Sequence, residues 1–304
     1  AIVDTHVLIL SKSKILHDTM IQVQTLSKKE IKDLHTLTQG TLNKDGSPIN
    51  VIANPIKRSI FEKILLSSVN LSNIAEVFNG VKPYEKGKGS PPQSEEILKT
   101  KPFTYDGAKP DGEEWKPLLR GSAINRYSIL WNHNSWIKYG SWLAAPRNSI
   151  LFNTDNAIFV RQTSDKIIAV ISPELHFVAR NNLHIVFVNE MCPKFLLGLM
   201  NSKLMDFAYN FINPEKGEAL AEVKKHHVEM LPITKSEKNN EFEPIIGSLV
   251  DQLLQLNKDK QMVSLQTKLD QIQSKIDYCE DKINKIVYEL YGLTDEEIKI
   301  VEGE

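Results

Sequence analysis

Four short runs between residues 117 and 188 decide the fold: PLLRGSAINRY (117–127), IFVRQT (158–163), KIIAV (166–170) and NLHIVFV (182–188). Each run is rich in residues that favour strands, and Asn, Asp, Ser and Pro separate the runs, which predicts antiparallel strands joined by polar turns. The Arg, Gln and Thr side chains inside them cannot all face a core. The runs therefore predict a β-rich domain that holds something polar.

The composition is typical of a globular protein of roughly two domains, with 304 residues, 41% hydrophobic and 25% charged. Cys192 and Cys279 are the only cysteines, and neither has a Cys or His at ligand spacing. This argues against a disulfide framework and a zinc site, and it favours a reducing, cytoplasmic location. No apolar run approaches the roughly 18 residues that span a bilayer, and Ala1 opens no signal-peptide pattern. The abrupt start leads us to expect a truncated chain.

The net charge of −1 hides an asymmetry along the chain. Residues 1–70 and 71–235 carry +3 each, and residues 236–304 carry −7. A mildly basic body followed by an acidic tail is compatible with nucleic-acid binding, but this imbalance is too small to demonstrate it.

A long loop region at residues 79–116 is rich in Gly and Pro and carries Lys82, Tyr84, Lys86 and Lys88. Loops of this length inside a domain are usually functional or disordered. Two interpretations stay open. The loop either touches a nucleic-acid backbone with its basic and aromatic side chains, or it is a solvated loop without a partner.

The first 66 residues are predicted to be the tail of another domain followed by a connector. Residues 2–10 (IVDTHVLIL) alternate between apolar and polar side chains and then become continuously apolar. This pattern predicts a strand whose sheet is supplied by another domain. The connector is expected to hold a short helix at Ser27–Leu34, whose first residues fit a capping box, and a turn at residues 43–48. The spacing of apolar residues predicts a further helix at Lys57–Leu66.

The segment after the strands is predicted to be mostly buried. Cys192–Tyr209 is expected to form one core helix with Pro in its first turn. Val228–Ile233 is expected to form a last short strand, and Ser236–Asn240 a linker.

Residues 248–291 contain neither Gly nor Pro, and they predict long helices with a coiled-coil-like seam. Apolar residues recur alternately every four and three positions from Leu265 to Leu290, but this register does not continue the one that ends at Leu256. A turn or a stutter is therefore expected between Leu256 and Ser264, so that either a hairpin or one long helix buries its seam, on itself or on a partner. Gly292 is expected to end the helix, and Thr294 to cap a short terminal one.

Together these elements predict an α+β protein in three parts. The tail and connector at 1–66 precede a mixed or antiparallel β-rich domain at 67–235, and a long helical, coiled-coil-like region follows at 236–304. This division places the four strand runs and the basic loop in one domain.

Four motifs resemble catalytic or ligand-binding signatures but lack their spacing or composition. Ser90–Gln93 (SPPQ) has Gln where a base-flipping methyltransferase loop has a stacking aromatic residue. The carboxylates and Lys of residues 110–116 crowd into one turn instead of two strands, and Lys86–Ser90 lacks P-loop spacing. His226 and His227 are adjacent, so they are expected to point apart as surface residues.

A set of motifs, in this order, resembles one known family: LLRGSAINRY (118–127), IFVRQT (158–163), LHI (183–185), LLGLMNS (196–202) and MLPI (230–233). They resemble the TaqI-like C-terminal specificity domain. That family is the target-recognition part of adenine-N6 DNA methyltransferases and of type II restriction enzymes that join methylation and cleavage in one chain. Residues 286–298 resemble the end of such fused enzymes, and residues 3–10 are similar to the last strand of their methyltransferase domain.

The resemblance implies sequence-specific recognition of double-stranded DNA, with the catalytic domains outside this chain. It implies a missing N-terminal methyltransferase domain as partner, no membrane, and S-adenosylmethionine and magnesium for the parent enzyme, with no cofactor, metal or catalytic residue expected here. Lysines would hold phosphates, while Arg, Gln, Asn and Thr at strand edges would read bases. The DNA-binding residues expected on this basis are Lys82, Tyr84, Lys86, Lys88, Arg120, Asn125, Arg126, Tyr127, Arg161, Gln162, Thr163 and Lys216.

Other interpretations of the same residues stay open. Arg120 and Arg126 could brace the sheet, and Trp131, Trp136 and Trp142 are more often core residues than base-stacking platforms. The chain could instead be an assembly module like a type I restriction specificity subunit, which the heptads favour, or an enzyme, which only the rejected motifs favour. The sequence does not give the DNA site, the oligomeric state, or whether the parent cleaves as well as methylates.

Overall fold

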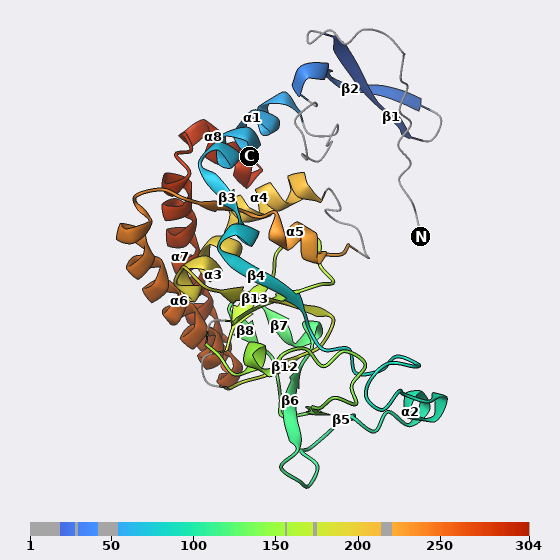
Figure 1. Cartoon of the computed structure of the whole chain (residues 1–304). Coiled ribbons are helices and arrows are strands. Elements are labelled where there is room, and N and C mark those ends of the chain that lie inside the picture. Colours follow the sequence, from blue (N-terminus) through green and yellow to red (C-terminus); the bar gives the residue numbers. More distant parts are fainter. Residues whose placement is uncertain are drawn as a thin grey trace. The chain divides into compact units, whose positions relative to one another are not determined.

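The computed structural model describes residues 19–27, 30–41, 54–155, 157–172, 175–213 and 221–303 (Figure 1). Two compact units divide the chain, one at residues 1–58 and the other at residues 59–304. In the part of the chain that the structure describes, no helix combines the length and hydropathy needed to cross a membrane.

The first unit contains a β-hairpin of β1 (Met20–Ser27) and β2 (Glu30–Thr38), followed by the short helix η1 (Gln39–Thr41). The helix predicted at Ser27–Leu34 is therefore wrong. The two strands pair from Met20 and Thr38 to Ser27 and Glu30, and this pairing outweighs the local capping-box pattern. The strand predicted at residues 2–10 and the turn at 43–48 lie outside the described residues.

Helix α1 (Pro55–Leu66) confirms the helix predicted at Lys57–Leu66. Its start is capped, because the Asn54 side-chain oxygen accepts a hydrogen bond from the Lys57 backbone N–H at 2.8 Å. The buried residues Ile60, Phe61 and Ile64 recur at helical spacing, as the sequence pattern predicts.

Two four-stranded sheets form the centre of the second unit and confirm the α+β fold (Figure 1). The strands are β3 (Ser68–Asn70), β4 (Ala75–Asn79), β5 (Thr104–Asp106), β6 (Trp115–Leu119), β7 (Ile124–Asn125), β8 (Ser128–Ile129), β9 (Ser135–Lys138), β10 (Ala157–Arg161), β11 (Ala169–Ile171), β12 (Val178–Ala179), β13 (Leu183–Val188) and β14 (Pro232–Thr234). The first sheet has the order β11-β10-β13-β4 and is antiparallel throughout. The second has the order β12-β6-β9-β5, in which only the β12–β6 pair is parallel. Each of the four sequence runs supplies a strand, as predicted.

Shorter elements connect these strands. They are η2 (Leu71–Asn73), α2 (Glu95–Thr100), η3 (Gly121–Ala123) and η4 (Ser149–Phe152), and small ladders join β3 to β14 and β7 to β8. The region predicted as one long loop, residues 79–116, therefore contains α2 and β5.

The single helix predicted at Cys192–Tyr209 is in fact two, α3 (Pro193–Met200) and α4 (Lys203–Ile212). The helix is interrupted at Asn201, because the Asn201 side-chain amide bonds to the backbone of β11 as a neighbouring strand would. It accepts from the Ala169 N–H and donates to the Ala169 carbonyl, both at 3.0 Å. Ser202 then caps α4 by accepting from the Met205 N–H at 3.2 Å.

The strand predicted at Val228–Ile233 is only partly correct. Helix α5 (Lys225–Glu229) occupies its beginning, and only β14 is extended. Helix α6 (Asn239–Met262) then starts inside the predicted linker Ser236–Asn240.

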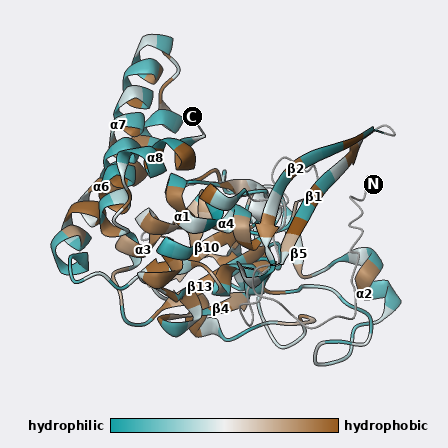
Figure 2. Ribbon diagram, turned by 90° about the horizontal axis from the view of Figure 1, so that it is seen from above, coloured by the Kyte–Doolittle hydropathy of each residue, from teal (hydrophilic) through white to brown (hydrophobic). Residues whose placement is uncertain are grey.

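The C-terminal region is a helical hairpin of α6 and α7 (Gln266–Leu290), followed by α8 (Asp295–Glu302). The break at residues 263–265 shows that, of the two predicted alternatives, a turn and not a stutter separates the two heptad registers. At Gly198, α3 lies so close to α6 that a Cβ would overlap the Ile246 side chain. Gly292, with φ of +65°, and the capping box of α8 also agree with the sequence. Figure 2 shows hydrophobic segments gathered where helices and sheets meet.

Candidate nucleic-acid interface

Three segments bring polar side chains together at one edge of the second unit. Arg120 follows the end of β6, Arg161 ends β10, and residues 180–182 form the turn between β12 and β13. The Asn182 side-chain oxygen accepts from the Gly121 N–H at 3.1 Å, and the Asn182 carbonyl accepts from the Gln162 N–H at 3.1 Å. We call the following seven residues the polar edge: Arg120, Arg161, Gln162, Thr163, Arg180, Asn181 and Asn182.

The end of β10 carries two side chains that are available to a ligand. The Arg161 stem lies against Gly121, and its guanidinium makes no hydrogen bond or ion pair with any described residue. Thr163 is exposed. Gln162 differs, because its amide already donates to the Glu222 carboxylate.

Arg120 lines a pocket of about 250 Å³ together with Asp106, Ser122 and Asn134. Its Nη2 is paired with the Asp106 carboxylate. Its buried Nε has no hydrogen-bond partner among the described residues. An unsatisfied buried N–H costs about 1–3 kcal/mol, so an incoming acceptor would be bound favourably here.

Arg180, Asn181 and Asn182 also belong to the polar edge, although no sequence motif predicted them as binding residues. Burial, and then the neighbouring Arg120 guanidinium, lower the pKa of Arg180 from its ordinary value. The available signal was a run of three polar residues between two short apolar strands, where a connecting loop is a usual place for binding residues.

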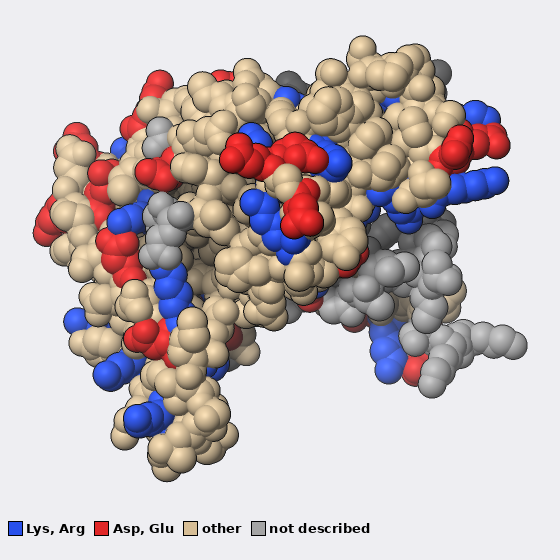
Figure 3. All heavy atoms as spheres, turned by 90° about the horizontal axis from the view of Figure 1, so that it is seen from below, with Lys and Arg blue, Asp and Glu red and all other residues tan. Residues whose placement is uncertain are grey.

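The predicted basic loop is held by interactions of its own. Lys82 Nζ pairs with Glu85 at 2.8 Å and Lys86 Nζ pairs with Glu95 at 2.5 Å, while Lys88 is exposed. Acidic and basic side chains lie next to one another over the face shown in Figure 3. Exposed pairs of this kind contribute about 0–1 kcal/mol, so they would open at little cost when a phosphate binds.

Tyr84, from the same loop, is half-buried. Its hydroxyl accepts from the Phe103 N–H at 2.7 Å and lies 3.2 Å from the Thr104 hydroxyl, and its ring stacks on Phe103. These contacts fix Tyr84 as a support of the loop.

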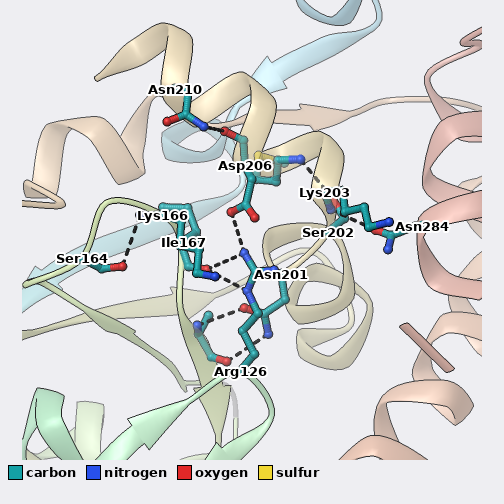
Figure 4. A network of polar contacts seen from close by, with 12 residues as sticks. Arg126, Ser164, Lys166, Ile167, Asn201, Ser202, Lys203, Asp206, Asn210 and Asn284 are labelled. Atoms are coloured by element: carbon teal, nitrogen blue, oxygen red, sulfur yellow. Dashed lines mark hydrogen bonds and ion pairs between the residues drawn. The ribbon is translucent and has the colours of Figure 1, made fainter. Parts of the chain in front are cut away.

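Arg126 braces the contact between the first sheet and α4 (Figure 4). Its Nε and Nη2 donate to the Ile167 carbonyl at 3.1 and 2.9 Å, and its Nη2 pairs with the Asp206 carboxylate at 2.5 Å. Its side chain is only 20% exposed. The structure therefore supports the bracing interpretation of this arginine.

The neighbours of Arg126 are placed differently. Tyr127, with φ of +57°, is 2% exposed and has no surface with which to contact DNA. Asn125 is exposed and lines a pocket of about 280 Å³ with residues of α7, including Gln273 and Glu280. Lys216 lies outside the described residues.

The three tryptophans in question pack within the protein. The indole N–H groups of Trp131, Trp136 and Trp142 each donate to a backbone carbonyl, at 3.0–3.3 Å. Trp131 also meets Trp136 edge to face, with ring centroids 5.2 Å apart. Trp136 is buried, as the core interpretation predicts, whereas Trp131 and Trp142 are partly exposed.

Two of the rejected motifs have structural roles. Gln93 is buried, and its amide donates to the carbonyls of Pro83 and Trp142, both at 2.8 Å, so it ties loops together. His227 is buried and its ring lies 4.1 Å from that of His226, so the expectation of two surface rings that point apart is wrong. Within the described ranges, no group of three or more His, Cys, Asp or Glu could hold a metal ion.

Comparison with known proteins gives one family match. Residues 116–233 match the model of the TaqI-like C-terminal specificity domain. No curated protein matches the sequence. A chain solved in work on complex assembly and conformational transition of the type I R-M system matches with 10% identity and a TM-score of 0.32, over 73% of this chain and 45% of that chain. The type I restriction-modification S subunit from M. genitalium matches with 12% identity and a TM-score of 0.27, over 77% of this chain and 53% of that chain.

The chain thus spans about half the length of those two structures, and TM-scores of 0.32 and 0.27 do not establish a common fold. The family match is more informative, because it runs from β6 to β14 and includes every residue of the polar edge. The match of residues 116–233 to the TaqI-like C-terminal specificity domain confirms the resemblance predicted from the motifs.

Proposed function

We propose that this chain recognises duplex DNA by sequence, as the specificity part of a restriction-modification protein. The observation that carries the proposal is the coincidence of two features on residues 116–233. This segment matches a specificity domain, and it gathers the polar edge, with two guanidinium groups that form no hydrogen bond or ion pair with any described residue.

Base reading would fall to the unengaged side chains of the polar edge. Arg161, Thr163 and Asn181 carry the donors and acceptors that match base edges in the major groove. Lys82, Lys86 and Lys88 would hold phosphates and so set the register of the protein on the duplex. Arg126 and Tyr127 are left out of this interface, because packing occupies them.

The proposal extends to the parent protein. The catalytic domains would lie outside this chain, in an adenine-N6 DNA methyltransferase or a type II enzyme that also cleaves. Those domains would bind S-adenosylmethionine and magnesium, and the methyltransferase domain would contact the same DNA. Two free cysteines, Cys192 and Cys279, fit the cytoplasmic location that we propose for it.

A second candidate function is assembly with other subunits, as in a type I restriction specificity subunit. The observation that favours it is the exposed apolar end of the helical hairpin, where Met262 is 88% and Leu265 57% exposed. Gel filtration with and without duplex DNA separates the two candidates. Self-association without any DNA complex would favour assembly.

The basic loop gives a first prediction. Replacing Lys82, Lys86 and Lys88 by Ala should weaken binding to every duplex alike, since phosphate contacts carry no sequence information. The slope of log affinity against log salt should fall by roughly two to three units. The matched control replaces three exposed lysines of α7, Lys268, Lys275 and Lys285, and should leave the slope unchanged. Equal slopes in the two triple variants would remove the loop from the interface.

Arg161 gives a second prediction. If its free guanidinium reaches a base edge, Arg161→Ala should cost about 1–3 kcal/mol on the preferred duplex and leave binding to random duplex nearly unchanged. Fluorescence anisotropy with both duplexes measures this difference. An equal loss on both duplexes would make Arg161 a phosphate contact, and a large drop in melting temperature would make it a brace.

A further inference from the structure

The backbone of Arg180 is held by interactions with three neighbouring segments. Its N–H donates to the Leu119 carbonyl at 2.9 Å, and its carbonyl accepts from the Leu183 N–H at 2.9 Å. A bridge also pairs it with Val81. The neighbouring Gly80 lies so close that a Cβ there would overlap the Arg180 carbonyl. Because β6, β13 and the segment that follows β4 all hold this residue, the start of its side chain has one defined position.

The guanidinium of Arg180, in contrast, is poorly satisfied. It is half-buried and makes no hydrogen bond or ion pair with any described residue. Arg120 lies beside it, because β12 and β6 are paired in parallel with Ala179 opposite Leu119, and each arginine directly follows one of these two residues. Burial, and then this neighbouring cation, lower the pKa of Arg180. The carboxylate of Asp106 pairs with Arg120, whose buried Nε still has no acceptor. Two neighbouring arginines therefore share one carboxylate, that of Asp106.

We propose that Arg180, with Arg120 beside it, binds the O6 and N7 acceptors of one guanine in the recognised duplex, and so determines the sequence preferred at that position. This inference rests on the proposed function. A planar guanidinium donates two parallel hydrogen bonds to these two atoms, which is the commonest specific contact between proteins and DNA. The Asp106 carboxylate neutralises one of the two guanidinium charges, which reduces the attraction of the site for a phosphate.

The test begins with a randomised duplex library, from which the wild-type chain selects its preferred sequence. Dissociation constants are then measured for wild type, Arg180→Lys and Arg180→Met on that duplex, on a scrambled duplex, and on duplexes with 7-deazaguanine at each guanine in turn. The Arg180→Lys variant keeps the positive charge but lacks the planar guanidinium that donates two parallel hydrogen bonds. Lys99→Ala, an exposed cation on α2, is the control for loss of charge alone.

We expect the analogue to weaken wild-type binding roughly ten- to hundred-fold at one guanine. Both Arg180 variants should lose a similar factor on the normal duplex, show no further loss with the analogue there, and bind scrambled duplex like wild type. The melting temperatures of both variants should stay near that of wild type, so that the loss reflects contact and not unfolding.

Other outcomes overturn the inference. Equal losses on preferred and scrambled duplexes would assign Arg180 to a phosphate, and a preferred sequence without guanine would exclude the contact. If wild type selects a sequence and both variants bind it unchanged, only this inference fails. If wild type selects no sequence at all, the proposed function fails with it.

Discussion

Ile276→Asp should lower the free energy of unfolding by about 3–4 kcal/mol, since it places an unpaired charge in a buried seam. Ile276 lies on α7 and is 5% exposed, and the same seam continues through the buried residues Cys279 and Ile283. Urea unfolding followed by circular dichroism measures the change.

The chain offers a matched control for this substitution. Leu265 occupies the same heptad series but is 57% exposed, because it lies where the hairpin turns. Leu265→Asp should therefore cause no loss of stability, and since Leu265 is the N-cap residue of α7, the new carboxylate can cap the helix. If both variants unfold like wild type, the seam is open in solution, and the assembly function gains support over packing within the chain.

Arg126→Met should destabilise the protein by about 3–5 kcal/mol, because it leaves the partly buried Asp206 carboxylate without its cation. Burial raises the pKa of Asp206, and the ion pair with Arg126 opposes this rise. The substitution also removes both hydrogen bonds to the Ile167 carbonyl. The same urea experiment measures the loss.

Arg161→Met is the control for Arg126→Met. Both arginines lie in the matched segment, but the Arg161 guanidinium has no partner among the described residues, so its loss should cost less than about 1 kcal/mol. Similar small costs for both variants would show that Arg126 is not a brace and would return it to the candidate interface.

Regular patterns in the sequence predicted the elements that depend on local spacing. The apolar period of α1, the heptads of α7 and the Thr294 capping box all appear as expected, because each records a periodicity or cap inside one segment. The hairpin of β1 and β2 was not predicted, because a local pattern does not report pairing between strands. A capping-box pattern at Ser27 is local, whereas strand pairing depends on a partner strand.

The features that the sequence did not predict depend on tertiary contacts. The helix break at Asn201 follows from its two hydrogen bonds to Ala169, a residue 32 positions earlier in the chain. The roles of Arg126 and Arg161 could not be separated by sequence, since both are arginines beside short strands. Arg126 meets Asp206 across 80 residues, and the polar edge joins residues 120, 161 and 180, which no local motif connects.

Selection of a preferred sequence from a randomised duplex library is the most direct test of the central claim. With the full chain at low salt, the account predicts enrichment of one short duplex sequence. It also predicts that Arg161→Ala loses the preference at one or two positions of that sequence while it retains binding to random duplex. Uniform recovery of all sequences at every salt concentration, or capture of single strands in preference to duplexes, would contradict recognition of duplex DNA by this chain.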